Sequence, residues 1–103
     1  MCGISGIFLN RARDVPLRDV ITRMSDPLLH RGPDDSGVWV DELSGAALGH
    51  RRLAILDLSA AGAQPMHSAC SRYVLAFNGE IYNHVQLRAE LEAAGHEMTW
   101  RGH

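Results

Sequence analysis

The sequence lacks lysine: all ten of its lysine and arginine residues are arginine, which we attribute to genome composition rather than function. It also lacks the run of about 18 apolar residues that a transmembrane helix needs, so no membrane span is expected. The start of the chain has neither the basic residues nor the apolar core of a signal peptide. Two cysteines, Cys2 and Cys70, are too few for a disulfide framework, which favours a reduced, cytoplasmic setting.

Charge and metal-ligand spacing exclude two further classes of protein. The formal net charge is −2 and no basic stripe is present, so nucleic acid is not an expected partner. The six histidines form no His-x-x-x-His pair and the cysteines no Cys-x-x-Cys pair, so no metal site is expected. A chain of 103 residues with 46% apolar residues is one globular domain, or a piece of one.

Apolar periodicity and turn-forming residues predict alternating strands, helices and loops. Strands are expected at residues 3–9, at 38–40, over 47–58 as a pair or one bent strand, at 73–77, and from 98 onward. Helices are expected over about 16–26, ended or kinked by Pro27, and from the cap Asn83 to the stop Gly95. Loops are expected at residues 30–37 and 59–71, with a hairpin connection at 41–45.

Cys2 is the first candidate for chemistry. Removal of Met1 would leave a thiol and a free α-amine on one residue. Such groups ordinarily have similar pKa values, so moving a proton between them costs about 1 kcal/mol. The amine can therefore act as the general base for its own nucleophile, whereas with Met1 attached this nitrogen is an amide and cannot. The alternative is a small residue at a frayed end.

The Asn78-Gly79 pair is the second candidate. Asn-Gly between apolar residues is a strong signal for a type I′ hairpin turn, but here a helix rather than a partner strand follows. The functional interpretation uses the Asn78 side-chain amide and the Gly79 N–H as two donors to an oxyanion. From this segment alone both interpretations stay open.

Two arginine-containing segments complete the candidates. Arg51 and Arg52 lie in a strand-like stretch, where successive side chains point to opposite faces, so at most one shares a pocket with Cys2. That arginine could hold a carboxylate through two parallel hydrogen bonds, and the alternative is that both are solvated surface charges. Arg31 opens a turn-forming segment that is in itself only a loop, and Asp34 and Asp35 have no neighbours that complete a metal site.

The order of these segments resembles that of class II glutamine amidotransferases, particularly the glutamine-hydrolysing asparagine synthetases. The segments are Cys2-Gly3-Ile4, His30-Arg31-Gly32-Pro33-Asp34, His50-Arg51-Arg52-Leu53, Gln64-Pro65 and Asn78-Gly79-Glu80-Ile81-Tyr82-Asn83. The resemblance covers essentially the whole chain, yet only about the first half of that family's amidotransferase domain, with the synthetase domain absent. The chain is therefore expected to be the N-terminal part of such a domain.

The resemblance implies an α+β fold, the N-terminal nucleophile hydrolase αββα sandwich in partial form, and a set of site residues. The implied roles are nucleophile for Cys2, oxyanion donors for Asn78 and Gly79, α-carboxylate binding for Arg52, pocket-lining carbonyls for Ile55 and Leu56, a place near the substrate ammonium for Glu80, and shaping of the site for Arg31. An acidic residue that binds the ammonium in the family would fall just beyond His103, so this chain by itself is expected to be inactive.

The implied reaction is hydrolysis of glutamine to glutamate and ammonia for ATP-dependent amidation of a carboxylate such as aspartate. The implied partners are glutamine and a synthetase domain of the same chain that uses ATP and Mg²⁺, whereas these residues themselves call for no cofactor. Unpaired sheet edges would favour self-association, so a homo-oligomer is left open. Alternatives are an amidotransferase for another acceptor, such as a sugar, an acylase for other amides, and an idle folding or assembly module.

Overall fold

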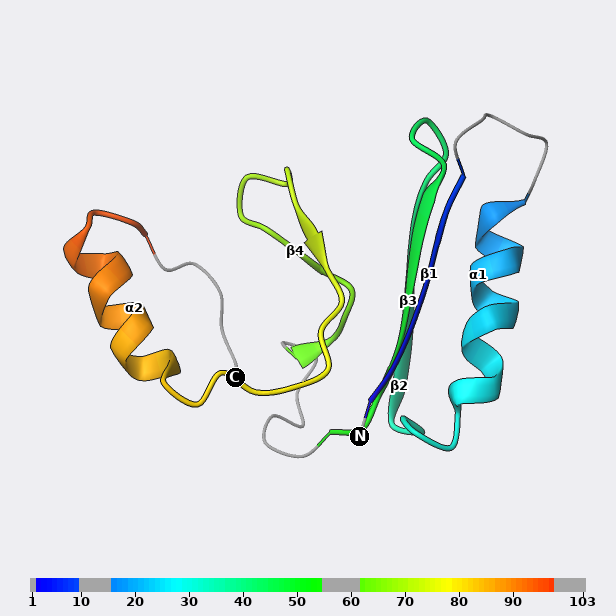
Figure 1. Cartoon of the computed structure of the whole chain (residues 1–103), viewed down its shortest axis with the longest axis horizontal. Helices are drawn as coiled ribbons and strands as arrows, with labels where there is room; N and C mark the ends of the chain where they lie inside the picture. Colours follow the sequence, from blue (N-terminus) through cyan, green and yellow to red (C-terminus); the bar gives the residue numbers. More distant parts are fainter. Residues whose placement is uncertain (1, 10–15, 55–61, 98–103) are drawn as a thin grey trace.

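The computed structural model describes residues 2–9, 16–54 and 62–97, which form an α+β arrangement (Figure 1). Its elements, in order, are β1 (Gly3–Phe8), α1 (Leu17–Ser25), the 3-10 turn η1 (Asp26–Leu28), β2 (Asp35–Asp41), β3 (Ala46–Arg52), β4 (Met66–His67), β5 (Val74–Leu75) and α2 (His84–Ala93). Neither helix is long and apolar enough to cross a membrane.

The larger sheet is antiparallel, with β3 in the centre and β1 and β2 on either side. Gly3 pairs with Arg51, and Asp35 pairs with Arg52. The first residues of β1 and β2 therefore meet the last residues of β3 at one end of the sheet. This register brings the N-terminus, the loop before β2 and the arginine pair together.

Helix α1 covers one face of this sheet (Figure 1). Its buried residues Leu17, Ile21 and Ser25 recur every four residues and so share one side of the helix. Gly49 in β3 lets the helix approach closely, because a β-carbon there would lie 2.6 Å from the Ser5 hydroxyl and overlap the Ser25 hydroxyl. Those two hydroxyls are 2.8 Å apart and hydrogen-bonded.

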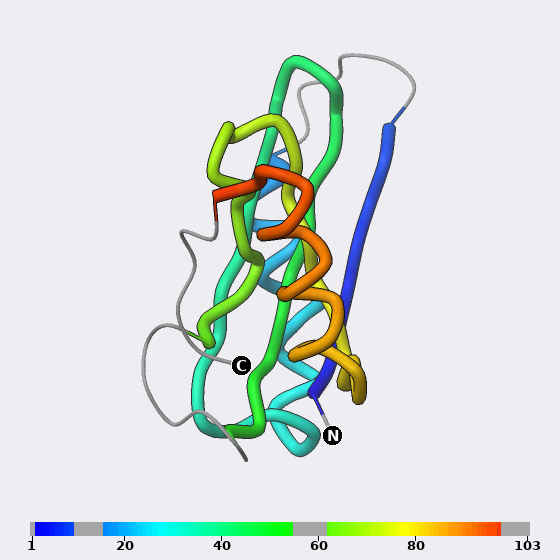
Figure 2. The backbone as a smooth tube through the Cα atoms, turned by 90° about the vertical axis from the view of Figure 1, so that its left-hand side faces the viewer, coloured from blue at the N-terminus to red at the C-terminus, as the bar shows by residue number. Residues whose placement is uncertain are grey.

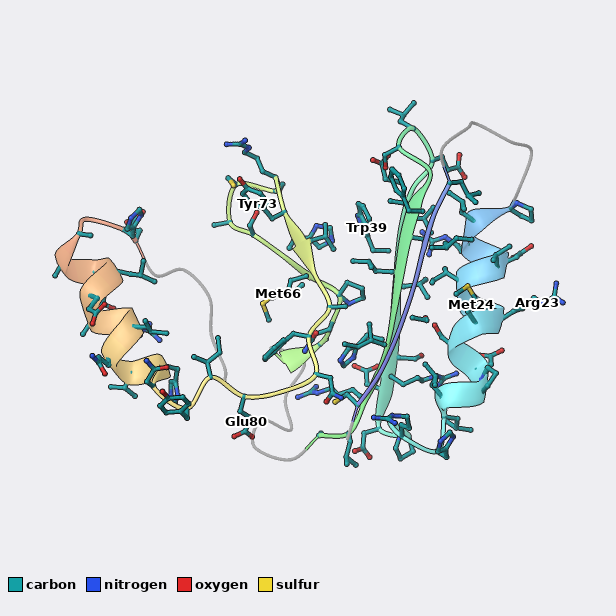
Figure 3. The ribbon with its side chains drawn as sticks, in the orientation of Figure 1. Arg23, Met24, Trp39, Met66, Tyr73 and Glu80 are labelled. Atoms are coloured by element: carbon teal, nitrogen blue, oxygen red, sulfur yellow. The ribbon has the colours of Figure 1, made fainter. Side chains whose placement is uncertain are left out.

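The helix begins and ends close to the predicted positions, but its buried side differs from the simple apolar pattern. Met24 is 39% exposed, and Ser25 is buried in its place. The hydroxyl of Ser25 donates to the Ile21 carbonyl, so this polar group is satisfied inside the interface. Arg23 points away from the sheet (Figure 3). Pro27 lies in η1, which confirms that it ends the regular helix.

The second half of the described chain lies on the other side of the sheet. In Figure 1, α1, the large sheet, the β4–β5 pair and α2 follow one another from right to left. Every residue of α2 is exposed, and large apolar side chains on it and before it face solvent, among them Tyr82 and Val85. The α+β class is confirmed, and the layered sandwich stays a prediction.

Several boundaries differ from the sequence predictions. Strand β2 begins at Asp35 and not at Val38, because the backbone of Asp35 to Gly37 pairs with β3. Strand β4 lies inside a segment predicted as loop, and β5 is only two residues long. Asn83 does precede α2, but its side chain makes no capping hydrogen bond. The strand expected from residue 98, and the end of the stretch expected at 47–58, lie outside the described residues.

Candidate active site

Cys2 lies at the end of the sheet where β3 finishes. The backbone N–H of Leu53 donates to the Cys2 sulfur at 3.4 Å, and the thiol faces the Leu53 carbonyl oxygen at 3.8 Å. The side chain is half-buried rather than extended into solvent. Cys2 is therefore packed against the residue that follows Arg52, which argues against a frayed end.

Arg31 reaches the same place from the loop before β2. Its Nε donates to the carbonyl oxygen of Cys2 at 3.3 Å, across 29 positions of sequence. The guanidinium is exposed, so this contact holds the main chain of Cys2 from the solvent side. Arg31 thus contacts the main chain of Cys2, and its role in shaping the site stays a prediction.

The loop that carries Arg31 is packed directly onto the backbone of β3. A β-carbon on the buried Gly32 would overlap the carbonyl group of Arg51 and the nitrogen of Arg52, so only glycine fits. Asp34 donates its N–H to the Arg52 carbonyl at 3.0 Å and accepts the Ala54 N–H on its carboxylate at 2.8 Å. What the sequence indicates as a turn is a brace across the end of β3.

The two neighbouring arginines point to opposite faces of the sheet, as predicted from strand geometry. Arg51 lies on the helix side, where it pairs with the Asp26 carboxylate at 2.9 Å. Arg52 lies on the other face, is 8% exposed, and has its guanidinium against Gly62, where a β-carbon would overlap Nη2. Neither is a freely solvated charge, and only Arg52 is on the face opposite α1.

The remaining predicted site residues that the structure describes are on the segment between β5 and α2. Asn78 is half-buried, and Gly79 and Glu80 are exposed. Neither Asn78 nor Gly79 has a positive φ, which rules out the type I′ turn that requires it at both positions. Figure 3 places Glu80 on this segment, at the lower end of the molecule.

The structure brings this segment and the N-terminus to the same end of the molecule, as Figures 1 and 2 both show. Within the described ranges, no hydrogen bond or ion pair links Cys2 to Asn78, Gly79 or Glu80. Their joint action on one substrate stays a prediction. Ile55 and Leu56, the predicted carbonyl ligands, lie outside the described residues.

Two residues of this region, His50 and Gln64, lie in segments named from the sequence, where no role of their own is predicted. His50, on the same strand face as Arg52, is 1% exposed, and its Nε2 is buried without a partner among the described residues. Burial lowers the pKa of His50, with Arg52 adding to the effect, while a hydrogen bond to the Phe77 backbone opposes it. Gln64 accepts the Phe77 N–H on Oε1 at 2.6 Å. Both residues lie near Phe77, which is distant from them in sequence, so no local pattern predicts this relationship.

Other features of the structure do not join this site. A cavity on the α1 side contains Arg51 but not Arg52; its lining residues are Thr22, Ser25, Asp26, Ser36, Gly37, Val38 and Arg51. Within residues 2–9, 16–54 and 62–97, no three His, Cys, Asp or Glu residues gather as metal ligands would. Cys70 is exposed, and a hydrogen bond with the Ser68 hydroxyl lowers the pKa of its thiol.

Comparison with known proteins decides the family. The sequence profile of a family described as "Glutamine amidotransferase domain" matches residues 1–103. The chain belongs to this family. The glutamine amidotransferase domain described here is thus recognised over the full length of the sequence, as the order of its segments indicates.

Curated relatives agree with the profile. The chain is 47% identical to asparagine synthetase B [glutamine-hydrolyzing] of Escherichia coli, over 87% of this chain and 16% of that protein. It is 42% identical to asparagine synthetase [glutamine-hydrolyzing] 1 of Bacillus subtilis, over 96% of this chain and 16% of that protein. It is 43% identical to asparagine synthetase [glutamine-hydrolyzing] 3 of the same organism, over 95% of this chain and 16% of that protein. The amidotransferase chain spans about a sixth of the length of these relatives.

Proposed function

We propose that this amidotransferase domain hydrolyses glutamine to glutamate and ammonia, with Cys2 as the nucleophile. The contact between the Cys2 sulfur and the Leu53 N–H, directly after the buried Arg52, is the observation that carries the proposal. This contact places the Cys2 thiol at the end of β3, the strand that carries Arg52. The relatives of this chain are named as glutamine-hydrolysing enzymes.

The proposed reaction begins once Met1 has been removed. The α-amine of Cys2 takes the thiol proton, and the thiolate attacks the carboxamide carbon of glutamine. Asn78 and Gly79 donate to the oxyanion of the tetrahedral intermediate. When the C–N bond breaks, the proton held by the amine leaves with ammonia and a thioester remains. Water then cleaves the C–S bond, which releases glutamate and restores the thiol.

The remaining site residues bind the substrate in this proposal. Arg52 holds the α-carboxylate through charge-assisted hydrogen bonds, while Glu80 lies near the α-ammonium. The carbonyls of Ile55 and Leu56 line the pocket. Arg31 keeps the main chain of Cys2 in place through its contact with the Cys2 carbonyl. Binding these groups in one geometry replaces part of the entropy cost of bringing them together.

For the longer protein we propose an asparagine synthetase-like enzyme. Its amidotransferase domain would have the N-terminal nucleophile hydrolase sandwich fold, of which these residues form the N-terminal part. Ammonia would pass to a synthetase domain of the same chain, where ATP and Mg²⁺ support amidation of a carboxylate such as aspartate. A cytoplasmic setting remains a prediction that rests on cysteine usage.

The test is release of glutamate from glutamine by the full-length protein, with removal of Met1 verified by intact mass. Cys2→Ala is expected to abolish hydrolysis, because no other group supplies the nucleophile. Cys70→Ser is the matched control, since it removes the other thiol of this chain and is expected to leave hydrolysis unchanged. Equal activity of Cys2→Ala and the unchanged protein would overturn the proposal.

A further inference from the structure

The backbone of Phe77, directly before Asn78, is held by a side chain from the segment before β4. The N–H of Phe77 donates to Gln64 Oε1 at 2.6 Å, across 13 positions of sequence. The buried ring of His50, on β3, lies beside the backbone of the same residue, and this neighbour raises its pKa against the effect of burial. Phe77 is thus hydrogen-bonded to the segment before β4 and lies beside the central strand of the large sheet.

Phe77 in turn restricts the two residues that follow it. Its ring lies over Gly79, where a β-carbon would come within 2.9 Å of the Phe77 Cζ. Asn78 lies between the held peptide and this ring contact, and it is half-buried although its neighbours are exposed. Because the main chain is fixed before Asn78 and covered at Gly79, the placement of both depends on Phe77.

The burial of His50 suits it to a fixed position beside the Phe77 backbone. Its side chain is 1% exposed and lies on the strand face that also carries Arg52. Its Nε2 is buried without a partner among the described residues, which costs free energy, so the ring is kept in this place despite that cost. Of the two ring nitrogens, Nδ1 is therefore the one left for the Phe77 backbone.

We propose that Gln64 and His50 are positioning residues that act through Phe77 to place Asn78 and Gly79 as oxyanion donors. The inference rests on the proposed glutamine hydrolysis and adds to it the residues that hold its donors in place. Neither side chain touches the substrate. Their contribution is to the geometry of the donors, and misplacement by about 1 Å is enough to cost up to about a hundredfold in rate.

The decisive pair of variants is Gln64→Met and Gln64→Glu in the full-length protein. Methionine keeps the length of the side chain but offers no oxygen to the Phe77 N–H, whereas glutamate keeps an acceptor. Gln64→Met is expected to lower kcat for glutamine hydrolysis about tenfold or more, with KM for glutamine within about twofold. Gln64→Glu is expected to restore most of kcat. Amide hydrogen exchange at Phe77 is expected to be faster only in Gln64→Met.

Alkylation of Cys2 by iodoacetamide separates positioning from misfolding. This displacement forms no oxyanion, so its rate in Gln64→Met should equal that of the unchanged protein. Equal kcat for the unchanged protein and Gln64→Met would overturn the inference, and so would equal losses in the methionine and glutamate variants. If Gln64→Met does not fold, His50→Leu and His50→Gln are compared by the same criteria. Failure of glutamine hydrolysis itself would appear separately, as retained activity in Cys2→Ala.

Discussion

The carboxylate of Asp34 accepts the backbone N–H of Ala54 at 2.8 Å, while the Asp34 N–H donates to the Arg52 carbonyl at 3.0 Å. The two bonds lie on either side of Leu53, the residue whose N–H faces the Cys2 sulfur. A loop that precedes β2 thereby sets the path of the chain as it leaves β3. The geometry around the proposed nucleophile depends on this brace.

Replacement of Asp34 tests the brace. Asp34→Ala removes the acceptor for the Ala54 N–H and is expected to lower the free energy of unfolding by about 1.5 kcal/mol, the low end of the range for hydrogen bonds to charged groups, because this bond is exposed. It should also lower the rate of glutamine hydrolysis by about tenfold, because Leu53 loses its fixed place. Asp34→Asn keeps an acceptor oxygen and should lose less in both urea unfolding and glutamate release. Equal losses in the two variants would contradict the role of the acceptor.

Gly32 tests how closely the loop must approach β3. Gly32→Ala would place a β-carbon on the backbone of Arg51 and Arg52, which cannot move without disturbing the sheet. We expect a loss of about 1–3 kcal/mol in unfolding free energy, typical of overpacking, together with a loss of glutamine hydrolysis. Gly6→Ala is the control, because its β-carbon would only touch Leu48 at 3.4 Å. Similar urea midpoints for both variants would show that the close approach is unimportant.

The opposite faces of Arg51 and Arg52 predict different consequences for their loss. Arg52→Met should raise KM for glutamine by about tenfold or more, as expected when a charge-assisted contact to a carboxylate is removed. Arg51→Met should leave KM unchanged and cost about 1 kcal/mol of stability or less, because its partner Asp26 is 59% exposed and the pair is screened. Steady-state kinetics with both variants check this. A larger rise in KM for Arg51→Met than for Arg52→Met would assign carboxylate binding to Arg51 instead.

His50 predicts a pH dependence of stability. Burial lowers the pKa of His50 in the folded protein below its ordinary value of 6.5, so the unfolded chain binds the proton more readily. The free energy of unfolding should therefore fall as the pH drops below 6.5, by at most about 1.4 kcal/mol per pH unit for one proton. Urea unfolding between pH 5 and 8 would measure the slope. His50→Gln should reduce it, and an unchanged slope would assign the effect to other groups.

Local patterns in the sequence predicted a large part of this fold. The start of β1, both helices and the β2–β3 turn follow from apolar spacing, Pro27 and the residues at 41–45, including Gly45 with its φ of +75°. Strand pairing was less predictable. Strand β2 extends back to Asp35, and β4 appears in a polar segment, because each receives backbone hydrogen bonds from the strand that follows it, which apolar spacing within the segment does not reveal.

For the candidate site, the types of residue were predictable and their connections were not. Cys2, Arg52 and Asn78 follow from the order of the segments, and alternation along a strand already separates Arg51 from Arg52. Gln64 accepts the Phe77 N–H from 13 positions away, and His50 lies near the same backbone from 27 positions away; neither relationship has a local signal in the sequence.

By itself, the sequence determined the family, the candidate nucleophile and the positions of both helices, because these depend on residue identity and on spacing within a few turns. Only the tertiary structure decided that Cys2 packs on Leu53, that Asp34 and Gly32 brace the end of β3, and that Gln64 accepts the Phe77 N–H. The physical reason is that backbone hydrogen bonds and close contacts join segments by distance in space, which side-chain identity along the chain does not encode locally.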